Sequence, residues 1–318
     1  MNNLMNKYNI SKGFYNKYFK LNAELRYAVE LLNFLYFKKG SFLNPKKKQD
    51  YIVQYINEEF DNFFIKNELN IPQVTFCVTT KCSLKCRDCG SLIPNFNSCN
   101  HIDMSIEEFK LNLDKITNVA TKIRRAVLLG GEPFLHPKIG EMIDLICCKS
   151  NIDVLEIMTN GTKIPSQKVL DILKKYNTKV YIYISNYSEN PVLKTILKND
   201  ELKQVLKEYN VKVQMVKTNG WLTEFGFGNK SSSLEDAVSK YDRCHCSHCT
   251  QIFNNKLYPC SKASSAIELG IIDVDDYVDI ISSDNLKKDL INYFKKDYFK
   301  ACETCILSDE PVMAAIQN

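Results

Sequence analysis

The hydrophobic pattern divides the chain into three parts with different periodicity. In the first part, apolar residues recur at helical spacing, most clearly at Leu25, Ala28, Val29, Leu32 and Leu35. From about 73 to 217, short runs rich in β-branched and aromatic residues alternate with helical patterns, and after 240 this alternation stops. We therefore expect a helical segment over 1–70, an α/β core over 71–235 and a smaller unit over 236–318.

The middle part predicts repeated βα units. Strand-like runs occur at 73–79, 125–129, 153–158, 179–185 and 211–216. Helical patterns fill the gaps, one starting at Ser105 with Glu108 at capping-box spacing, and the others covering roughly 137–149, 165–176 and 191–208. Such units form a parallel sheet that closes fully or partly into a barrel, with the active site at the carboxyl ends of the strands. The functional residues are therefore expected in the loops that follow the strands.

Three cysteines directly follow the first strand-like run. Cys82, Cys86 and Cys89 form a CxxxCxxC triplet. Three thiolates in so short a loop can hold three corners of a four-iron cluster, which leaves the fourth iron open to a small molecule. Alternatively, the three positions would share one face of a helix and could be buried core thiols or a zinc site. The strand period before the triplet and the charged residues within it favour the cluster.

A second motif, Gly130-Gly131-Glu132-Pro133, follows the second strand-like run. With the triplet, it resembles the radical S-adenosylmethionine (SAM) enzymes. In that family the triplet binds a [4Fe-4S] cluster, the open iron chelates the amino and carboxylate groups of SAM, and the GGEP segment receives the SAM amino group. The resemblance implies a partial (β/α)6 barrel of the TIM type. Asp88 departs from the pattern, because many members have an aromatic residue there that packs near the adenine.

Short polar residues follow the third and fourth strand-like runs, in Thr159-Asn160-Gly161 and Ser185-Asn186-Tyr187. Such side chains can donate hydrogen bonds to ribose hydroxyls or to a carboxylate, although TNG is also a good turn sequence. In family members of this layout the equivalent loops contact the SAM ribose and carboxylate. Thr159, Asn160 and Ser185 are therefore candidates for SAM binding, whereas His136 is expected to be structural.

Six cysteines lie after residue 240, at Cys244, Cys246, Cys249, Cys260, Cys302 and Cys305. Their spacing resembles the auxiliary-cluster extension of the family, in its long (SPASM) or short (twitch) form, with Asn255 in place of a turn glycine. Too few cysteines follow for two auxiliary clusters, so the resemblance implies one [4Fe-4S] cluster. Cys260, Cys302 and Cys305 are the preferred ligands, Cys249 or Cys244 is the fourth, and Cys246 is the least favoured. Four thiolates also suit structural zinc, which stays an alternative.

Composition indicates the cellular compartment and the classes of binding partner. The 318 residues carry a net charge of +5, and 45% are hydrophobic and 25% charged, which is ordinary for a globular protein. The first residues contain no apolar signal segment, and the 13 cysteines occur at ligand spacings, so we expect reduced thiols in the cytoplasm. Basic and acidic residues are interspersed, and no phosphate-binding glycine loop is present, so neither nucleic acid nor a membrane is expected as a partner.

The resemblance implies a radical SAM oxidoreductase. Reductive cleavage of SAM would give a deoxyadenosyl radical that abstracts hydrogen from the substrate, with an electron donor such as flavodoxin or ferredoxin and with oxidation assisted by the auxiliary cluster. The first 70 residues lack the strand pattern of a winged-helix peptide-recognition domain, which favours a small, sugar-like substrate. The alternatives are a maturase of a ribosomally made peptide and a non-catalytic iron-sulfur or zinc carrier.

Several aromatic residues could line a substrate pocket, although aromatic side chains in strands more often belong to a core. They are Tyr181, Tyr183, Tyr187, Trp221 and Tyr258. No catalytic acid or base is assigned.

Overall fold

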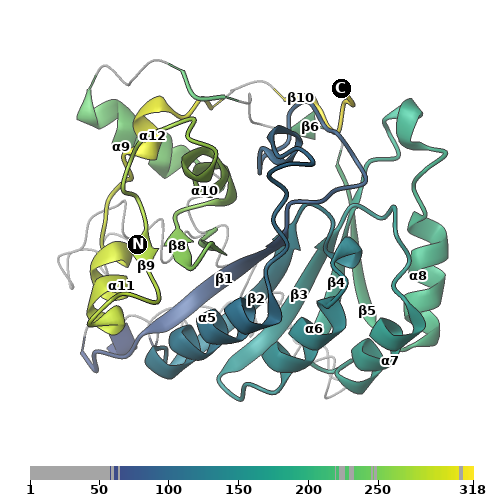
Figure 1. Cartoon of the computed structure of the whole chain (residues 1–318), viewed down its shortest axis with the longest axis horizontal. Helices are drawn as coiled ribbons and strands as arrows, with labels where there is room; N and C mark the ends of the chain where they lie inside the picture. The colour runs from purple at the N-terminus through teal and green to yellow at the C-terminus, as the bar shows by residue number, and fades with distance from the viewer. Residues whose placement is uncertain are drawn as a thin grey trace, which may run out of the picture.

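The computed structural model of the chain describes residues 58, 61–63, 65–218, 220–221, 226–228, 233–244, 246, 249–307 and 311–318. The helical segment expected over 1–70 therefore lies almost entirely outside the described residues. The described part forms an α/β fold around a mostly parallel sheet of eight strands (Figure 1). The predicted fold class is confirmed.

The sheet has the strand order β5-β4-β3-β2-β1-β7-β8-β9. Its first five strands are parallel neighbours, as expected for successive βα units. They comprise β1 Asn70–Thr79, β2 Lys122–Gly130, β3 Ile152–Thr159, β4 Val180–Asn186 and β5 Lys212–Lys217. All five were predicted within three residues of their observed ends. Strand β1 pairs with β7 and not with β5, so the sheet of the described residues does not close. It forms an open, partial barrel.

Helices cover one face of this sheet. Figure 1 shows α5, α6 and α7 side by side over it, with α8 beside β5. Their bounds are α5 Ile106–Val119, α6 Ile139–Cys147, α7 Gln167–Lys175 and α8 Asn199–Glu208. The apolar face of α5 packs on β1, where the ring centroids of Phe109 and Phe76 lie 4.9 Å apart and both side chains are fully buried. This packing holds the triplet loop, which follows β1, on a rigid support.

The helical pattern at 191–208 is interrupted in the structure. A short 3-10 helix, η3 Pro191–Leu193, precedes α8 Asn199–Glu208, and the residues between them are not helical. At the break the chain makes a tertiary contact, in which the main-chain N–H of Lys198 donates to Gly161 O at 2.7 Å. This contact ties the start of α8 to the loop after β3.

The other face of the sheet carries polar residues, because side chains alternate along each strand. Arg125 of β2 donates to Glu156 of β3 at 2.8 Å and to Gln73 of β1 at 2.6 Å. The hydroxyl of Tyr181 on β4 donates to the same Glu156, which is buried. Tyr181, considered as a pocket residue, is thus part of a polar network that links four strands.

The part of the chain after residue 233 adds to the same sheet. Strand β7 Gln251–Phe253 pairs in parallel with β1, while β8 Lys256–Tyr258 and β9 Val278–Asp279 extend the sheet in antiparallel fashion. The helices of this part are α9 Leu234–Arg243, α10 Ser261–Glu268, α11 Leu286–Phe294 and α12 Ala301–Thr304. Antiparallel pairing in this sheet thus begins only at β8, after the parallel strand β7.

A second, two-stranded sheet joins β6 Gly220–Trp221 to β10 Val312–Met313 near the rim (Figure 1). Among the described residues, no helix combines the length and apolar character needed to cross a bilayer.

Candidate active site

The cysteine triplet lies in the loop after β1, inside a small apolar cluster. Its buried members are Leu84, Cys86, Leu193 and Ala315, and partly buried residues packed against them include Cys82, Cys89, Tyr187, Leu197 and Trp221. The rings of Tyr187 and Trp221 meet edge to face at 5.7 Å. The three thiols therefore share one environment with little water.

Each of the three sulfurs accepts hydrogen bonds from N–H groups. Cys82 Sγ accepts from Leu84 N at 3.4 Å and from Asn160 Nδ2 at 3.5 Å. Cys86 Sγ accepts from Gln317 Nε2 at 3.3 Å, and Cys89 Sγ accepts from the main-chain N–H groups of residues 91–93. Because such donors stabilise the thiolates that ligate iron-sulfur clusters, the residues present fit this group.

Burial affects the pKa of all three triplet thiols. Burial raises the pKa of Cys82 to about 12 and that of Cys86 to about 11, and hydrogen bonds from Leu84 and Gln317 oppose the rise. A ligating metal displaces thiol protons, so cluster binding would lower these pKa values. In the described part of the chain, no group of three or more His, Cys, Asp or Glu side chains lies in an arrangement that could hold a metal ion.

The GGEP segment lies directly against the triplet loop. Gly131 N donates to Thr79 O at 2.7 Å, and Glu132 N donates to Lys81 O at 2.8 Å. A Cβ atom on Gly130 would lie 2.2 Å from Thr79 O, and one on Gly131 would lie 2.0 Å from Lys81 O. Only glycine permits this approach of the two loops, which lie side by side as predicted.

Glu132 anchors the loop that follows β3. Its fully buried carboxylate accepts from Thr159 Oγ1 at 2.9 Å, from Asn160 N at 2.9 Å and from Phe134 N at 3.2 Å. Burial raises the pKa of Glu132 to about 7, and these hydrogen bonds limit the rise. Pro133 follows as the first residue of η2 Pro133–Leu135. The side chains of Glu132 and Thr159 thus hold two loops together.

Asn160 faces the triplet directly. Besides Cys82, its Nδ2 atom contacts Ser83 Oγ at 3.2 Å, and its Oδ1 atom accepts from Thr162 N at 3.0 Å. A turn with the left-handed residue Gly161 (φ 75°) places Asn160 there. Of the polar residues predicted for SAM, Asn160 lies nearest to the cysteines by these contacts.

Ser185 lies at the end of β4, where it hydrogen bonds to Tyr187. Burial raises the pKa of the Tyr187 hydroxyl far above its usual value, and this hydrogen bond opposes the rise. Because Tyr187 packs in the apolar cluster of the triplet, Ser185 contributes to the same rim of the sheet.

Five of the six later cysteines line one cavity between α9, α10 and α12. They are Cys244, Cys246, Cys260, Cys302 and Cys305. Cys249 is not among the lining residues, although its main-chain N–H donates to Cys246 O at 3.0 Å. The structure thus places Cys246, the residue that the sequence least favoured, in the cavity, and places Cys249 next to it.

Donors also surround these sulfurs. Cys260 is the N-cap of α10, and its Sγ accepts from Ala263 N at 3.4 Å. Lys262 Nζ lies 3.4 Å from Cys305 Sγ, and Lys262 is only 7% exposed. A buried lysine beside grouped thiols suits an anionic cluster, because its charge offsets that of the thiolates. Asn255 has φ 61°, which agrees with its predicted role in a left-handed turn.

Comparison with known proteins identifies the family. Residues 76–219 match the model of the Radical SAM superfamily. Residues 76–219 are therefore a radical SAM domain. The cofactors of this superfamily are a [4Fe-4S] cluster and SAM, as predicted.

Two curated proteins are similar in sequence to part of this chain. The antilisterial bacteriocin subtilosin biosynthesis protein AlbA of Bacillus subtilis (strain 168) is 33% identical over 125 residues, which are 39% of this chain and 26% of that protein. GTP 3',8-cyclase of Syntrophomonas wolfei is 29% identical over 99 residues, which are 30% of this chain and 29% of that protein. Each match spans less than a third of the relative's length.

Solved radical SAM structures resemble this chain only loosely. The structure of anSMEcpe with bound AdoMet has a TM-score of 0.47 and 12% identity, covering 75% of this chain and 80% of that one. Streptococcus suis SuiB bound to the precursor peptide SuiA has a TM-score of 0.38 and 18% identity, covering 55% and 38%.

Other residues considered from the sequence divide into structural residues and neighbours of the triplet. His136 is buried, with Nε2 3.1 Å from Met104 O and Nδ1 accepting from Lys138 N at 3.1 Å, in the structural role expected of it. Tyr258 is fully buried and donates to Glu268, so it is a core residue. Tyr187 and Trp221 do lie beside the triplet.

Sequence reasoning missed one segment of this radical SAM site, residues 311–318. Ala315 is fully buried in the triplet's apolar cluster, and Gln317 contacts Cys86. No motif or periodicity marks these residues, since only the fold brings them to the loop.

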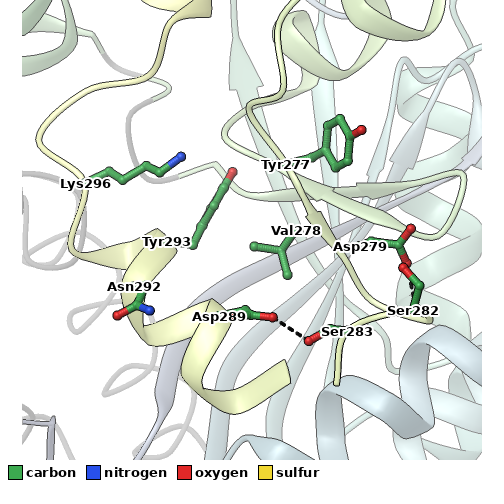
Figure 2. A pocket seen from close by; sticks show the side chains of 9 residues that line it. All are labelled: Tyr277, Val278, Asp279, Ser282, Ser283, Asp289, Asn292, Tyr293 and Lys296. Atoms are coloured by element: carbon green, nitrogen blue, oxygen red, sulfur yellow. Dashed lines mark hydrogen bonds between the residues drawn. The ribbon is translucent and has the colours of Figure 1, made fainter. Parts of the chain in front are cut away.

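A separate surface hollow of about 300 Å³ lies between β9 and α11 (Figure 2). Its walls include Tyr277, Tyr293 and Lys296, and Ser283 donates to Asp289 at 2.6 Å across it. It contains no cysteine and none of the residues predicted to bind SAM.

Proposed function

We propose that Cys82, Cys86 and Cys89 hold a [4Fe-4S] cluster and that the adjoining loops bind SAM on it. One observation carries this proposal: N–H donors face all three sulfurs at the point where Gly130 and Gly131 bring the GGEP segment against the triplet loop. The SAM-binding residues would be Gly130, Gly131, Glu132, Pro133, Thr159, Asn160 and Ser185.

When bound, the reduced cluster and SAM would supply a deoxyadenosyl radical that abstracts hydrogen from the substrate, after one electron arrives from a donor such as flavodoxin or ferredoxin. The chain's own residues position these groups. Buried Glu132 fixes the loop of Thr159 and Asn160, while Tyr187 and Trp221 keep water from the triplet.

We propose that the grouped thiols of 236–318 form a SPASM- or twitch-like auxiliary site for one [4Fe-4S] cluster. Cys260, Cys302 and Cys305 are the preferred ligands, and they line one cavity with Cys244 and Cys246. Cys244 or Cys249 would be the fourth ligand: Cys244 lines the cavity, and Cys249 lies beside Cys246. None of the 13 cysteines forms a disulfide, which suits reduced thiols in the cytoplasm.

For the substrate, we propose a ribosomally made peptide as the first candidate. The support is the AlbA match, because the name of that protein places it in the biosynthesis of a bacteriocin. A small, sugar-like molecule, which the sequence favoured, is the second candidate. In either case, hydrogen abstraction followed by electron transfer to the auxiliary cluster would give an oxidised product.

Metal analysis tests the cluster assignment. We expect roughly eight irons per anaerobically reconstituted chain, falling to about four in a Cys82, Cys86, Cys89 triple alanine variant and also in a Cys260, Cys302, Cys305 variant. Cys99→Ala is the matched control, because Cys99 is exposed, follows the triplet in sequence and belongs to neither proposed site. Four irons with one zinc would make the later site structural, and full iron in the triplet variant would refute the assignment.

SAM cleavage tests the activity. With dithionite, the reconstituted protein should convert SAM to methionine and 5'-deoxyadenosine, and the triplet variant should not. A peptide encoded beside the gene, or a sugar, should raise deoxyadenosine formation above the uncoupled rate if it is the substrate. Intact SAM under these conditions would instead indicate an electron carrier.

A further inference from the structure

The segment 311–318 forms part of the wall around the triplet, 231 residues away from it in sequence. Arg87 N donates to Ile316 O at 2.7 Å, and Asn318 N donates to Lys85 O at 2.9 Å. These bonds place Gln317 opposite Cys86 as an antiparallel pair. Asn190 Nδ2 also donates to Ala315 O at 2.8 Å, so the segment is held from two sides.

The orientation of the Gln317 amide follows from its partners. Its Oε1 atom accepts from Lys85 N at 2.8 Å, and a main-chain N–H can only donate. Its Nε2 atom lies 2.7 Å from Ala315 O and 3.3 Å from Cys86 Sγ, both of which are acceptors. Since a flipped amide would set donor against donor, one N–H of Gln317 points to the sulfur.

We propose that Gln317 is a positioning residue that raises the reduction potential of the triplet cluster by donating a hydrogen bond to Cys86 Sγ. This inference rests on the proposed ligation by Cys82, Cys86 and Cys89. Reduction adds negative charge to the cluster and its sulfurs, so an N–H donor stabilises the reduced state more than the oxidised one. Cys86 is only 8% exposed, and a low local dielectric strengthens the effect.

The Gln317 side chain differs from the main-chain donors of Cys89 in the part of the chain that supplies it. Cys89 is held by main-chain N–H groups of its own loop, which a substitution does not remove. The side-chain donor to Cys86 comes from a segment outside the motif, and this segment is held in place by the pairing of β6 with β10 and by Asn190. The potential of the cluster is therefore coupled to the docking of residues 311–318.

The test is a potentiometric titration followed by EPR of the reconstituted protein without SAM. The Cys82, Cys86, Cys89 alanine variant supplies the auxiliary-cluster signal for subtraction. Gln317→Leu removes the donor, and Gln317→Glu keeps an acceptor for Lys85 N but cannot donate when ionised. Both should shift the triplet cluster to a more negative potential while keeping its iron.

Asn318→Asp is the matched control, because it adds a charge at the next residue and keeps the main-chain bond to Lys85. It should shift the potential less than Gln317→Glu. An unchanged potential in Gln317→Leu, or equal shifts in Gln317→Leu and Asn318→Asp, would overturn the proposal. Loss of triplet iron in both Gln317 variants would overturn it in favour of a purely structural role. If the triple alanine variant keeps all its iron, the ligand assignment itself fails, which is a separate outcome.

Discussion

Single residues decide how closely the two motif loops approach each other. Gly130 and Gly131 have no side chain, and this lets Thr79 and Lys81 carbonyls accept from the GGEP main chain. The sequence motif indicated that these glycines have a role. The structure shows that the role is steric, because a Cβ atom would collide with the carbonyls of Thr79 and Lys81. A side chain here would push apart the loop that carries Cys82 and the segment that precedes Glu132.

We expect Gly131→Ala to displace the triplet loop. Its Cβ would lie 2.0 Å from Lys81 O and 3.0 Å from Cys82 N, and both atoms are backbone. Overpacking of this kind costs about 1–3 kcal/mol or more, and the loop would lose cluster occupancy. Iron content after reconstitution and the thermal midpoint measure the effect.

Gly90→Ala is the control for that substitution. Gly90 follows Cys89 in the same loop, yet nothing lies within 4 Å of the Cβ that alanine would add there. It should keep its iron and its midpoint. Equal losses in the two variants would show that the loop tolerates no side chain anywhere and would refute the steric explanation.

At the scale of elements, local sequence signals and structure agree most closely along α5. Ser105 accepts from Glu108 N at 3.0 Å, which is the contact that the capping-box spacing predicted. The apolar positions of this helix then meet β1, so the helix supports the strand that leads into the triplet. The pattern at 191–208 failed for the opposite reason, because Gly161 ties the chain at Lys198.

Ser105→Ala should lower the free energy of unfolding by about 1 kcal/mol, because a main-chain N–H loses its cap. Urea unfolding measures this as a lower midpoint at an unchanged slope. Ser166→Ala is the matched control, since Ser166 is the N-cap of α7 but makes no side-chain capping bond. A loss of the same size in both variants would contradict the assigned role of the Ser105 hydroxyl.

At the scale of the whole molecule, the proposed units 71–235 and 236–318 share one sheet. Besides the β1–β7 pairing, Thr250 Oγ1 donates to Gln73 O at 2.5 Å, and Thr75 N donates to Thr250 O at 2.9 Å. The segment 311–318 closes a second connection at the triplet loop. A boundary near residue 235 would therefore divide the two proposed cluster sites, but it does not divide two independently packed cores.

We expect these two units to unfold in a single transition. Loss of the later unit would expose the edge of β1 and remove the wall at Cys86, which links the stability of both parts. Coincident changes in far-ultraviolet circular dichroism and in cluster absorbance during heating would support this expectation. Two separated transitions, with the triplet cluster surviving the first, would contradict it.

The sequence by itself determined the βα order, the strand positions, the capping of α5 and the two cysteine groups, because these are recorded in local periodicity and spacing. The family also followed from motifs whose residues lie close together in the chain. Tertiary structure alone decided that β7 continues the sheet beside β1, that Cys246 lies in the later cavity, and that Gln317 reaches Cys86. These contacts join residues distant in sequence, and their geometry depends on how whole elements pack, which no local pattern encodes.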